Sequence, residues 1–288
     1  DPRGPSPGSK HLVSAKQSPL PDTATETTGP VLALPALAPF IYREADTSGG
    51  SHVAANAPGS TRIDSSAIAK RSAFRASLLK WAKNHRRIFP WREPQTGPYG
   101  ILMAELLLKR TTAVSASHIY HGFMSQYPTP FHLARAPEER LALDLARVGL
   151  QRQRAKDIGK LARYLVDHES GIVPGSLTTL KSVPGLGDYS ARAILSFGHG
   201  TPSAVVDSNV ARVLSRVFQD VFPERPKPKL LQALADALLP TRQHRVFNFA
   251  LIDLGALVCL PSRPRSEKCP LLEICDYARR QPSDVSTT

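Results

Sequence analysis

The sequence lacks the features that mark membrane proteins and secreted proteins. No apolar run reaches the roughly 18–20 residues that cross a bilayer. The nearest, residues 31–40, is short and is interrupted by Pro35 and Pro39. Cysteine is scarce, with three in 288 residues and all of them among the last thirty, so a disulfide framework is not expected. The chain does not start with a basic and then apolar signal sequence. We therefore expect an intracellular protein in a reducing setting, without a membrane partner.

Acidic residues are also few relative to basic ones. The chain holds 37 Lys and Arg against 24 Asp and Glu, a formal net charge of +13. Residues 1–60 contain four of these basic residues and five of the acidic ones, so the excess of positive charge belongs to the rest of the chain. Such a charge favours a polyanionic partner, although a basic surface alone does not identify a nucleic acid.

Segments that alternate apolar and polar residues are scarce, whereas helical apolar spacing is frequent, which predicts an all-α body. Residues 1–66 are rich in Pro, Ala, Ser, Thr and Gly without periodicity, so we expect a disordered tail there. A first helix is expected from the N-cap pair Ser65-Ser66 to the segment 89–92. Its apolar face is expected to contain Ile68, Phe74, Leu78 and Trp81. Further helical patterns cover 101–108, 115–127, 137–147, 152–169, 176–181, 188–198, 208–219, 228–238 and 244–257.

The most specific local pattern is Val183-Pro184-Gly185-Leu186-Gly187, which lies between two helical segments. Its glycines can adopt positive φ, which allows a tight turn and a close approach of the backbone to another molecule. The free amides at the start of the following helix can then bind a phosphate. A single carboxylate, Asp207, follows at the start of the next helix. A phosphate site with a carboxylate beside it indicates chemistry on a nucleic acid.

Two carboxylates stand out by their surroundings. Glu105 interrupts the apolar segment Ile101–Leu108, where burial of an ionised carboxylate is costly and raises its pKa. It is a candidate acid or hydrogen-bonding group, or alternatively a structural carboxylate that binds a backbone amide or an arginine. Asp207, in Asp207-Ser208-Asn209-Val210, is suited to be a helix N-cap, and that role is compatible with catalysis.

These motifs together resemble the helix-hairpin-helix (HhH-GPD) DNA glycosylase superfamily, in the branch of endonuclease III and the A/G-specific adenine glycosylase. The resemblance covers about residues 68–278 and depends on several pieces that occur in the family order. They are Phe89-Pro90-Trp91-Arg92, Ala104-Glu105-Leu106-Leu107-Leu108, Val148-Gly149-Leu150, Val183-Pro184-Gly185-Leu186-Gly187 and Val206-Asp207.

The resemblance implies an all-α, two-lobed fold with a DNA-reading cleft between the lobes. A six-helix domain would cover residues 98–204, with the helix-hairpin-helix at about 176–198. The other lobe would combine the N-terminal helix of 67–97 with the C-terminal helices of 205–288.

The resemblance also implies the reaction. A target base is flipped out of the duplex and its N-glycosidic bond is cleaved. Asp207 would stabilise the positively charged sugar and position the water, and Glu105 would supply a proton or hydrogen bond to the departing base. Bifunctional relatives have a lysine where this chain has Tyr189. Because a phenol cannot form an imine, Tyr189 indicates a monofunctional glycosylase with weak or no strand cleavage. The alternative is that Tyr189 only packs.

Tyr189 and the segment Lys109-Arg110-Thr111-Thr112-Ala113 are similar to the G/T mismatch-specific thymine glycosylases. We therefore expect a monomer that removes thymine or uracil opposite guanine from double-stranded DNA. Adenine removal is the alternative, although the chain ends at Thr288, soon after its last cysteine, which leaves no room for the C-terminal domain usual in adenine glycosylases. A non-catalytic DNA-binding module is a third interpretation, disfavoured by the presence of both Glu105 and Asp207.

The same resemblance implies contacts with DNA. Arg110 and Leu150 align with family positions that fill the space left by the flipped nucleotide, where a planar or bulky side chain is needed. Gln151, Arg152 and Arg154 are candidates for the orphaned base or nearby phosphates, or are solvated surface residues. The other expected DNA contacts are Gly185, Leu186 and Gly187 in the hairpin and the basic residues Arg263, Arg265 and Lys268.

The spacing Cys259-x9-Cys269-x5-Cys275 resembles the iron–sulfur loop of the family, in which four thiolates hold a [4Fe–4S] cluster. Ser266 stands at the place of the fourth cysteine, and its oxygen is harder and far less acidic than a thiol. The chain therefore has an oxygen-ligated or three-cysteine cluster, has lost the metal, or carries an engineered substitution. We expect a cluster whose role is to shape the basic loop that contacts phosphates.

Overall fold

The computed structural model describes residues 65–222 and 226–280. These residues contain helices and no β-strand, which confirms the all-α fold class. None of the helices in this part of the chain has the length and apolar character that a bilayer-spanning helix requires. The tail expected over residues 1–66 lies outside the described residues except for its last two positions, which already belong to the first helix.

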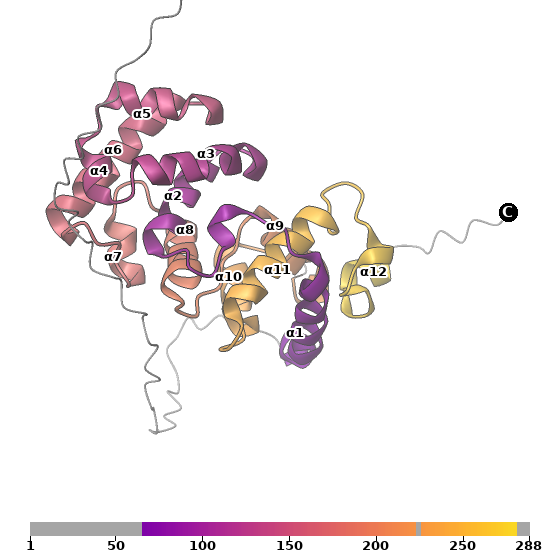
Figure 1. Cartoon of the computed structure of the whole chain (residues 1–288). Coiled ribbons are helices and arrows are strands. Elements are labelled where there is room, and N and C mark those ends of the chain that lie inside the picture. Colours follow the sequence, from indigo (N-terminus) through magenta and orange to yellow (C-terminus); the bar gives the residue numbers. More distant parts are fainter. Residues whose placement is uncertain (1–64, 223–225, 281–288) are drawn as a thin grey trace, which may run out of the picture. The chain divides into compact units, whose positions relative to one another are not determined.

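The helices follow one another with short connections (Figure 1). The α-helices are α1 (Ser65–His85), α2 (Pro98–Leu108), α3 (Ala113–Gln126), α4 (Pro130–Arg135), α5 (Glu138–Asp144), α6 (Gln151–Glu169), α7 (Leu177–Ser182), α8 (Asp188–Ala193), α9 (Ser208–Val217), α10 (Pro228–Leu238), α11 (His244–Leu257) and α12 (Asp276–Arg280). The short 3-10 helices are η1 (Pro90–Arg92), η2 (Ala146–Val148), η4 (Gln219–Val221), η5 (Ser266–Lys268) and η6 (Leu272–Ile274), and α8 continues into a π-helix, η3 (Ile194–His199).

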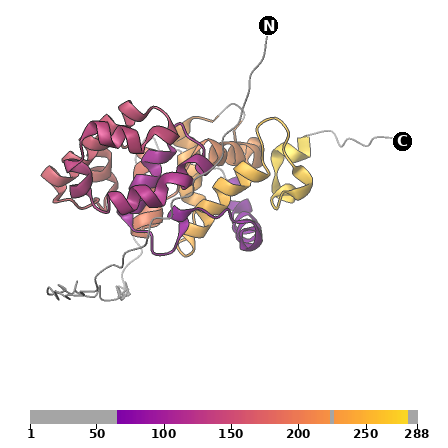
Figure 2. The ribbon, with the colours of Figure 1, turned by 45° about the horizontal axis from the view of Figure 1, so that its top comes forward.

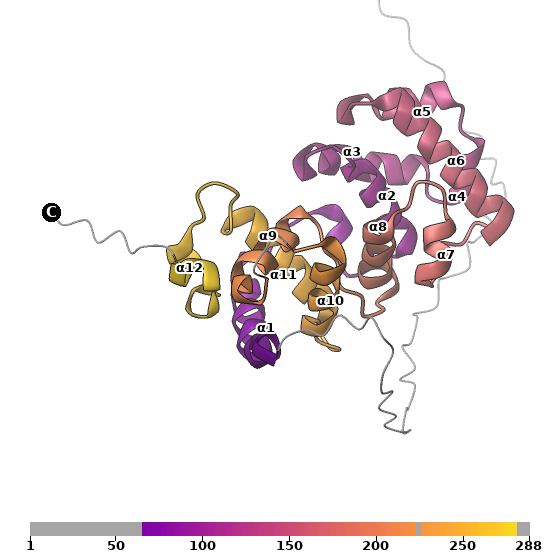
Figure 3. The same cartoon turned by 180° about the vertical axis from the view of Figure 1, so that it is seen from behind.

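The helices of residues 65–222 and 226–280 surround two hydrophobic cores. The first core gathers α2 to α8 with η3, and α2 is buried along almost its whole length, from Gly100 to Leu107. The second core gathers α1 with α9 to α12. Figures 1 and 3 show these two groups side by side, with α8 turned toward α10, and Figure 2 shows α12 at the end far from α4 and α5.

A buried ion pair connects the segment before α2 to the second core. Asp253, on α11, is fully buried and accepts hydrogen bonds from Arg87 Nε at 2.6 Å and from Arg92 Nη1 at 2.6 Å. The Arg92 guanidinium also lies 4.4 Å from the centroid of the Phe249 ring. Because a buried carboxylate needs such partners, Asp253 fixes the η1 segment and with it the start of α2.

Two helical predictions differ from the structure. In α1 the buried positions are Ala67, Phe74, Leu78 and Ala82 with Trp81, whereas Ile68 is 42% exposed. The prediction for Ile68 was wrong because it lies one residue, and so about 100° of helix rotation, away from this face. Helix α4 was not predicted.

Candidate active site

Glu105 is the buried carboxyl group of the first core. It is 8% exposed on α2, surrounded by Ala104, Leu106 and the helices that pack on them. No described residue donates a hydrogen bond to it, so the structural alternative, a bond to an arginine or a backbone amide, finds no support there. Burial, and to a smaller extent the negative charge of Asp207, raise the pKa of Glu105 to about 8, while Lys109 acts in the opposite direction. A carboxyl group with this pKa is protonated at neutral pH and can donate a proton.

Asp207 is the N-cap of α9, as its sequence context predicts. Its Oδ1 accepts a hydrogen bond from the backbone amide of Val210 at 2.7 Å, and its Oδ2 accepts one from Asn209 Nδ2 at 3.0 Å. These bonds fix the direction of the carboxylate at the positive end of the helix dipole. The side chain is half-buried, so one side of it remains accessible.

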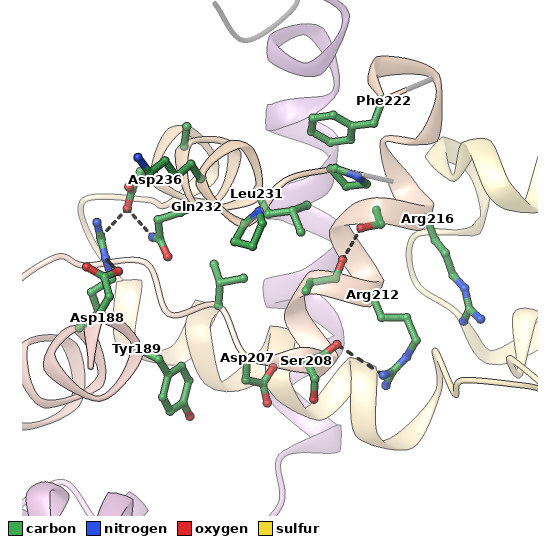
Figure 4. Close-up of a pocket in the computed structure, with 18 of the residues that line it drawn as sticks. Asp188, Tyr189, Asp207, Ser208, Arg212, Arg216, Phe222, Leu231, Gln232 and Asp236 are labelled. Atoms are coloured by element: carbon green, nitrogen blue, oxygen red, sulfur yellow. Dashed lines mark hydrogen bonds and ion pairs between the residues drawn. The ribbon is translucent and has the colours of Figure 1, made fainter. Parts of the chain in front are cut away.

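Tyr189, in the first turn of α8, lies within the electrostatic influence of both carboxyl groups. Its pKa is raised well above the ordinary value by burial first and then by the charges of Glu105 and Asp207, against a smaller lowering by Arg92. The charge of Asp207 thus influences the pKa of Glu105, and both carboxyl groups influence the pKa of Tyr189, so the three groups lie near one another. Figure 4 shows the Tyr189 and Asp207 side chains next to each other with their oxygen atoms toward the same side.

Tyr189 and Asp207 also line an open groove of about 1500 Å³ between α8, α9 and α10. Glu105 does not line this groove, because α2 is buried in the first core. The three residues therefore come together only in part: Tyr189 and Asp207 line the same groove, and Glu105 is close enough to raise the pKa of Tyr189. The basic residues that line the groove are Lys181, Arg192, Arg212, Arg216 and Lys229.

The expected hairpin is formed by α7, the turn and α8. Gly185 has a φ of +80°, which favours glycine, and its carbonyl accepts a hydrogen bond from Lys109 Nζ at 2.7 Å. Gly187 is the N-cap of α8 and is exposed. Leu186 is 8% exposed and packs in the first core, so only its backbone is available to a DNA molecule.

The residues expected to fill the duplex lie at the surface. Leu150 is 53% exposed, Arg110 and Gln151 are exposed, and both Arg110 and Leu150 have positive φ. Arg152 is exposed as well. The interpretation of Arg154 as a DNA contact was wrong, because this residue is 7% exposed and its guanidinium donates hydrogen bonds to backbone carbonyls.

The cysteine loop places Cys259, Cys269 and Cys275 around one small cavity that Ser266 also lines. Burial raises the pKa of Cys269 to about 11 and also raises that of Cys275, with smaller contributions from neighbouring thiols. Arg216 Nη1 donates to Cys259 Sγ at 3.2 Å. In the described part of the chain no three side chains are grouped as metal ligands, and a [4Fe–4S] cluster requires four thiolates where three are present. The described residues supply three of the four thiolates that this cluster needs, and the cluster stays a prediction. The basic residues of this loop, Arg263, Arg265 and Lys268, are exposed.

Two basic residues lie near the site although the sequence analysis did not assign them to it. Lys109 follows Glu105 by one helical turn, and that spacing was the available signal. Burial lowers the pKa of Lys109, against the raising effect of Asp157 and Glu105. Arg92 was seen in its motif, but only the fold brings its charge near Tyr189.

Comparisons with known proteins agree with this arrangement. The family described as "HhH-GPD superfamily base excision DNA repair protein" matches residues 103–241. The thymine/uracil-DNA glycosylase of Methanothermobacter thermautotrophicus is 34% identical over 216 residues, which cover 75% of this chain and 97% of that protein. The human adenine DNA glycosylase is 34% identical over 225 residues, which cover 74% of this chain but 41% of that protein. The solved structure of a thermostable thymine-DNA glycosylase aligns with a TM-score of 0.71 and 34% identity, over 74% of this chain and 99% of that one.

Proposed function

The chain belongs to the HhH-GPD superfamily of base excision DNA repair proteins, and on this premise we propose that it is a monofunctional DNA glycosylase for mispaired thymine or uracil. The substrate is double-stranded DNA with the target base opposite guanine, and the protein acts as a monomer. The main support is the position of Asp207, which is fixed as an N-cap and lies beside Tyr189 on the wall of a groove with basic residues.

The reaction begins with extrusion of the target nucleotide, because its glycosidic bond is not accessible in a stacked duplex. Unstacking costs roughly a few kcal/mol and least for a mispair, which contributes to selectivity. The exposed side chains of Arg110 and Leu150 then fill the space that the nucleotide leaves. The amides at the start of α8 and the exposed loop residues Arg263 and Lys268 bind phosphates of the backbone.

Cleavage of the N-glycosidic bond leaves positive charge on the sugar, and the bonding electron pair stays with the base. The Asp207 carboxylate stabilises this charge and orients the attacking water, whose oxygen joins C1′. The water passes one proton to the Asp207 carboxylate in this step, and the proton then leaves to solvent. Because the hydrogen bonds from Val210 and Asn209 hold the carboxylate in place before the substrate binds, little reorganisation is needed in the transition state.

Glu105 acts on the departing base. With a pKa raised to about 8 by burial, its carboxyl group is neutral at pH 7 and can donate a proton to the base as the bond breaks. The Asp207 carboxylate nearby contributes to this raised pKa, so the two acids have different roles because their surroundings differ.

Tyr189 supports a reaction that stops at base release. A phenol cannot form an imine with the sugar, so the strand is not cut by a covalent route through this residue. Its hydroxyl stays protonated, because burial and the two carboxyl groups raise its pKa well above the ordinary value. It can therefore donate a hydrogen bond to the extruded nucleotide.

The test is single-turnover base release with enzyme in excess over G·T, G·U, A·G and A·8-oxoguanine duplexes, followed by alkali. We expect strand breaks only after alkali and only for the G·T and G·U duplexes. Release of adenine instead would favour the alternative specificity. Breaks without alkali would contradict the monofunctional assignment, and equal binding of all duplexes without base release would leave a binding module.

A further inference from the structure

Arg154 is a buried cation in α6 that has no acidic partner among residues 65–222 and 226–280. Its neighbours Gln151 and Arg152 are exposed. Its own guanidinium donates hydrogen bonds to backbone carbonyls from two segments that are far apart in the sequence, 106–109 and 148–149. A buried guanidinium is tolerated only where its donors are satisfied, so these segments have to keep their carbonyls directed at it.

The first segment is the end of α2. Arg154 Nη1 donates to the carbonyls of Leu106 at 2.7 Å and Leu107 at 3.3 Å, and Nη2 donates to the carbonyl of Lys109. Carbonyls in the last turn of a helix lack partners within the helix and form the negative end of its dipole. The guanidinium therefore caps the helix that carries Glu105.

The first segment continues into the loop 109–111, and the second segment is the loop 148–150. Arg154 Nε donates to the Gly149 carbonyl at 2.9 Å, and Nη2 donates to Thr111 Oγ1 at 2.6 Å. The Thr111 hydroxyl in turn donates to the Val148 carbonyl at 2.8 Å. One guanidinium and one hydroxyl thus connect the two loops to each other and to the end of α2.

Each of these loops contains a residue in the left-handed region, Arg110 with a φ of 52° and Leu150 with a φ of 51°. This conformation is unfavourable for residues other than glycine and asparagine, and it persists where the surroundings fix it. Hydrogen bonds to Lys109 and Thr111 lie on both sides of Arg110, and hydrogen bonds to Val148 and Gly149 directly precede Leu150.

We propose that Arg154 is a positioning residue for base extrusion, which holds Arg110 and Leu150 as one rigid pair at the surface. This inference rests on the proposed function, in which the two side chains fill the space left by the target nucleotide. The planar guanidinium donates hydrogen bonds to several carbonyls in fixed directions at once, which a lysine ammonium cannot do.

The test measures extrusion separately from chemistry. The probe is a duplex with 2-aminopurine beside a G·U pair whose target nucleotide carries a 2′-fluoro group, so that the base is unstacked without being released. Arg154→Lys keeps the positive charge and removes the planar guanidinium group. Thr111→Val removes the bridging hydroxyl at nearly constant volume. It tests the same proposal if Arg154→Lys does not fold. Arg135→Lys, exposed on α4 and outside the expected DNA contacts, is the matched control.

We expect the fluorescence increase on saturating binding to fall roughly ten-fold in Arg154→Lys and Thr111→Val, with DNA affinity equal to that of the control. Because Arg154 acts through Arg110 and Leu150, adding Arg154→Lys to the double variant Arg110→Ala/Leu150→Ala should cause no further loss. An undiminished signal in both variants, effects that multiply, or a parallel loss of affinity and thermal midpoint would overturn the proposal. A wild type that extrudes uracil but does not release it from an unmodified G·U duplex would refute the proposed chemistry and still support the positioning role.

Discussion

Replacing Glu105 with glutamine should change the pH dependence of stability. The pKa of this carboxyl group is raised from 4.5 to about 8, mainly by burial. Between these values the unfolded chain has lost the proton and the folded protein still binds it, so the folded protein loses stability as the pH rises. Each pKa unit corresponds to about 1.4 kcal/mol, and the loss reaches at most about 5 kcal/mol at pH 8 and then levels off. Glutamine does not ionise, so the variant should lack this loss.

The measurement is the free energy of unfolding by urea at pH 5 and at pH 8 for the wild type, Glu105→Gln and the control Glu139→Gln, which alters an exposed glutamate of α5. Relative to the wild type, Glu105→Gln should gain several kcal/mol between pH 5 and pH 8, and the control should not. A difference between Glu105→Gln and the wild type that is the same at both pH values would refute the raised pKa.

The same substitution should impair the reaction, because an amide cannot donate the proton that the departing base requires. Base release from a G·U duplex should fall by roughly a hundred-fold or more, the usual contribution of a positioned acid. In the wild type the single-turnover rate should decrease as the pH rises through about 8, where the Glu105 carboxyl group ionises. A variant with the wild-type rate would exclude Glu105 as the acid.

Three further predictions concern the other groups of the site. Asp207→Asn keeps an oxygen acceptor for the Val210 amide but loses the negative charge, so base release should fall by roughly a hundred-fold or more while DNA affinity in a gel-shift assay stays unchanged; normal turnover would refute its role. Tyr189→Lys should introduce an amine that borohydride traps on the DNA as a reduced imine, and the absence of any trapped complex would show that residue 189 does not reach the sugar. Ser266→Cys restores a fourth thiol next to Cys269, so anaerobically purified variant should contain more iron and absorb more strongly near 400 nm than the wild type; equal iron in both would contradict the need for a fourth thiolate.

Sequence patterns predicted most helices because each amphipathic segment buries its own apolar stripe. The segment 228–238 was predicted with the same limits as α10, and 244–257 with those of α11. Asp207 was identifiable as an N-cap because that role depends on local sequence alone. Helix α1 was located, but Ile68 was misplaced, since a long helix offers several apolar stripes and only the packing against α11 selects one.

The site could be predicted only in part. A carboxylate in an apolar helix indicated Glu105, yet its absence from the wall of the groove follows from how α2 is enclosed by other helices. Arg154 follows Gln151 and Arg152 in a polar run, so the sequence gives no sign that it is buried. The positive φ of Arg110 and Leu150 was not predictable either, because neither residue type favours it and long-range hydrogen bonds impose it.

The central claim is that Asp207, Tyr189 and Glu105 receive one extruded nucleoside. It is tested most directly by a crystal structure of Asp207→Asn bound to a duplex with a G·T mispair. The account predicts that the thymidine lies outside the helix, with its C1′ next to residue 207 and its base between Tyr189 and Glu105. A thymidine still stacked in the duplex, or extruded to a place away from these three residues, would contradict it.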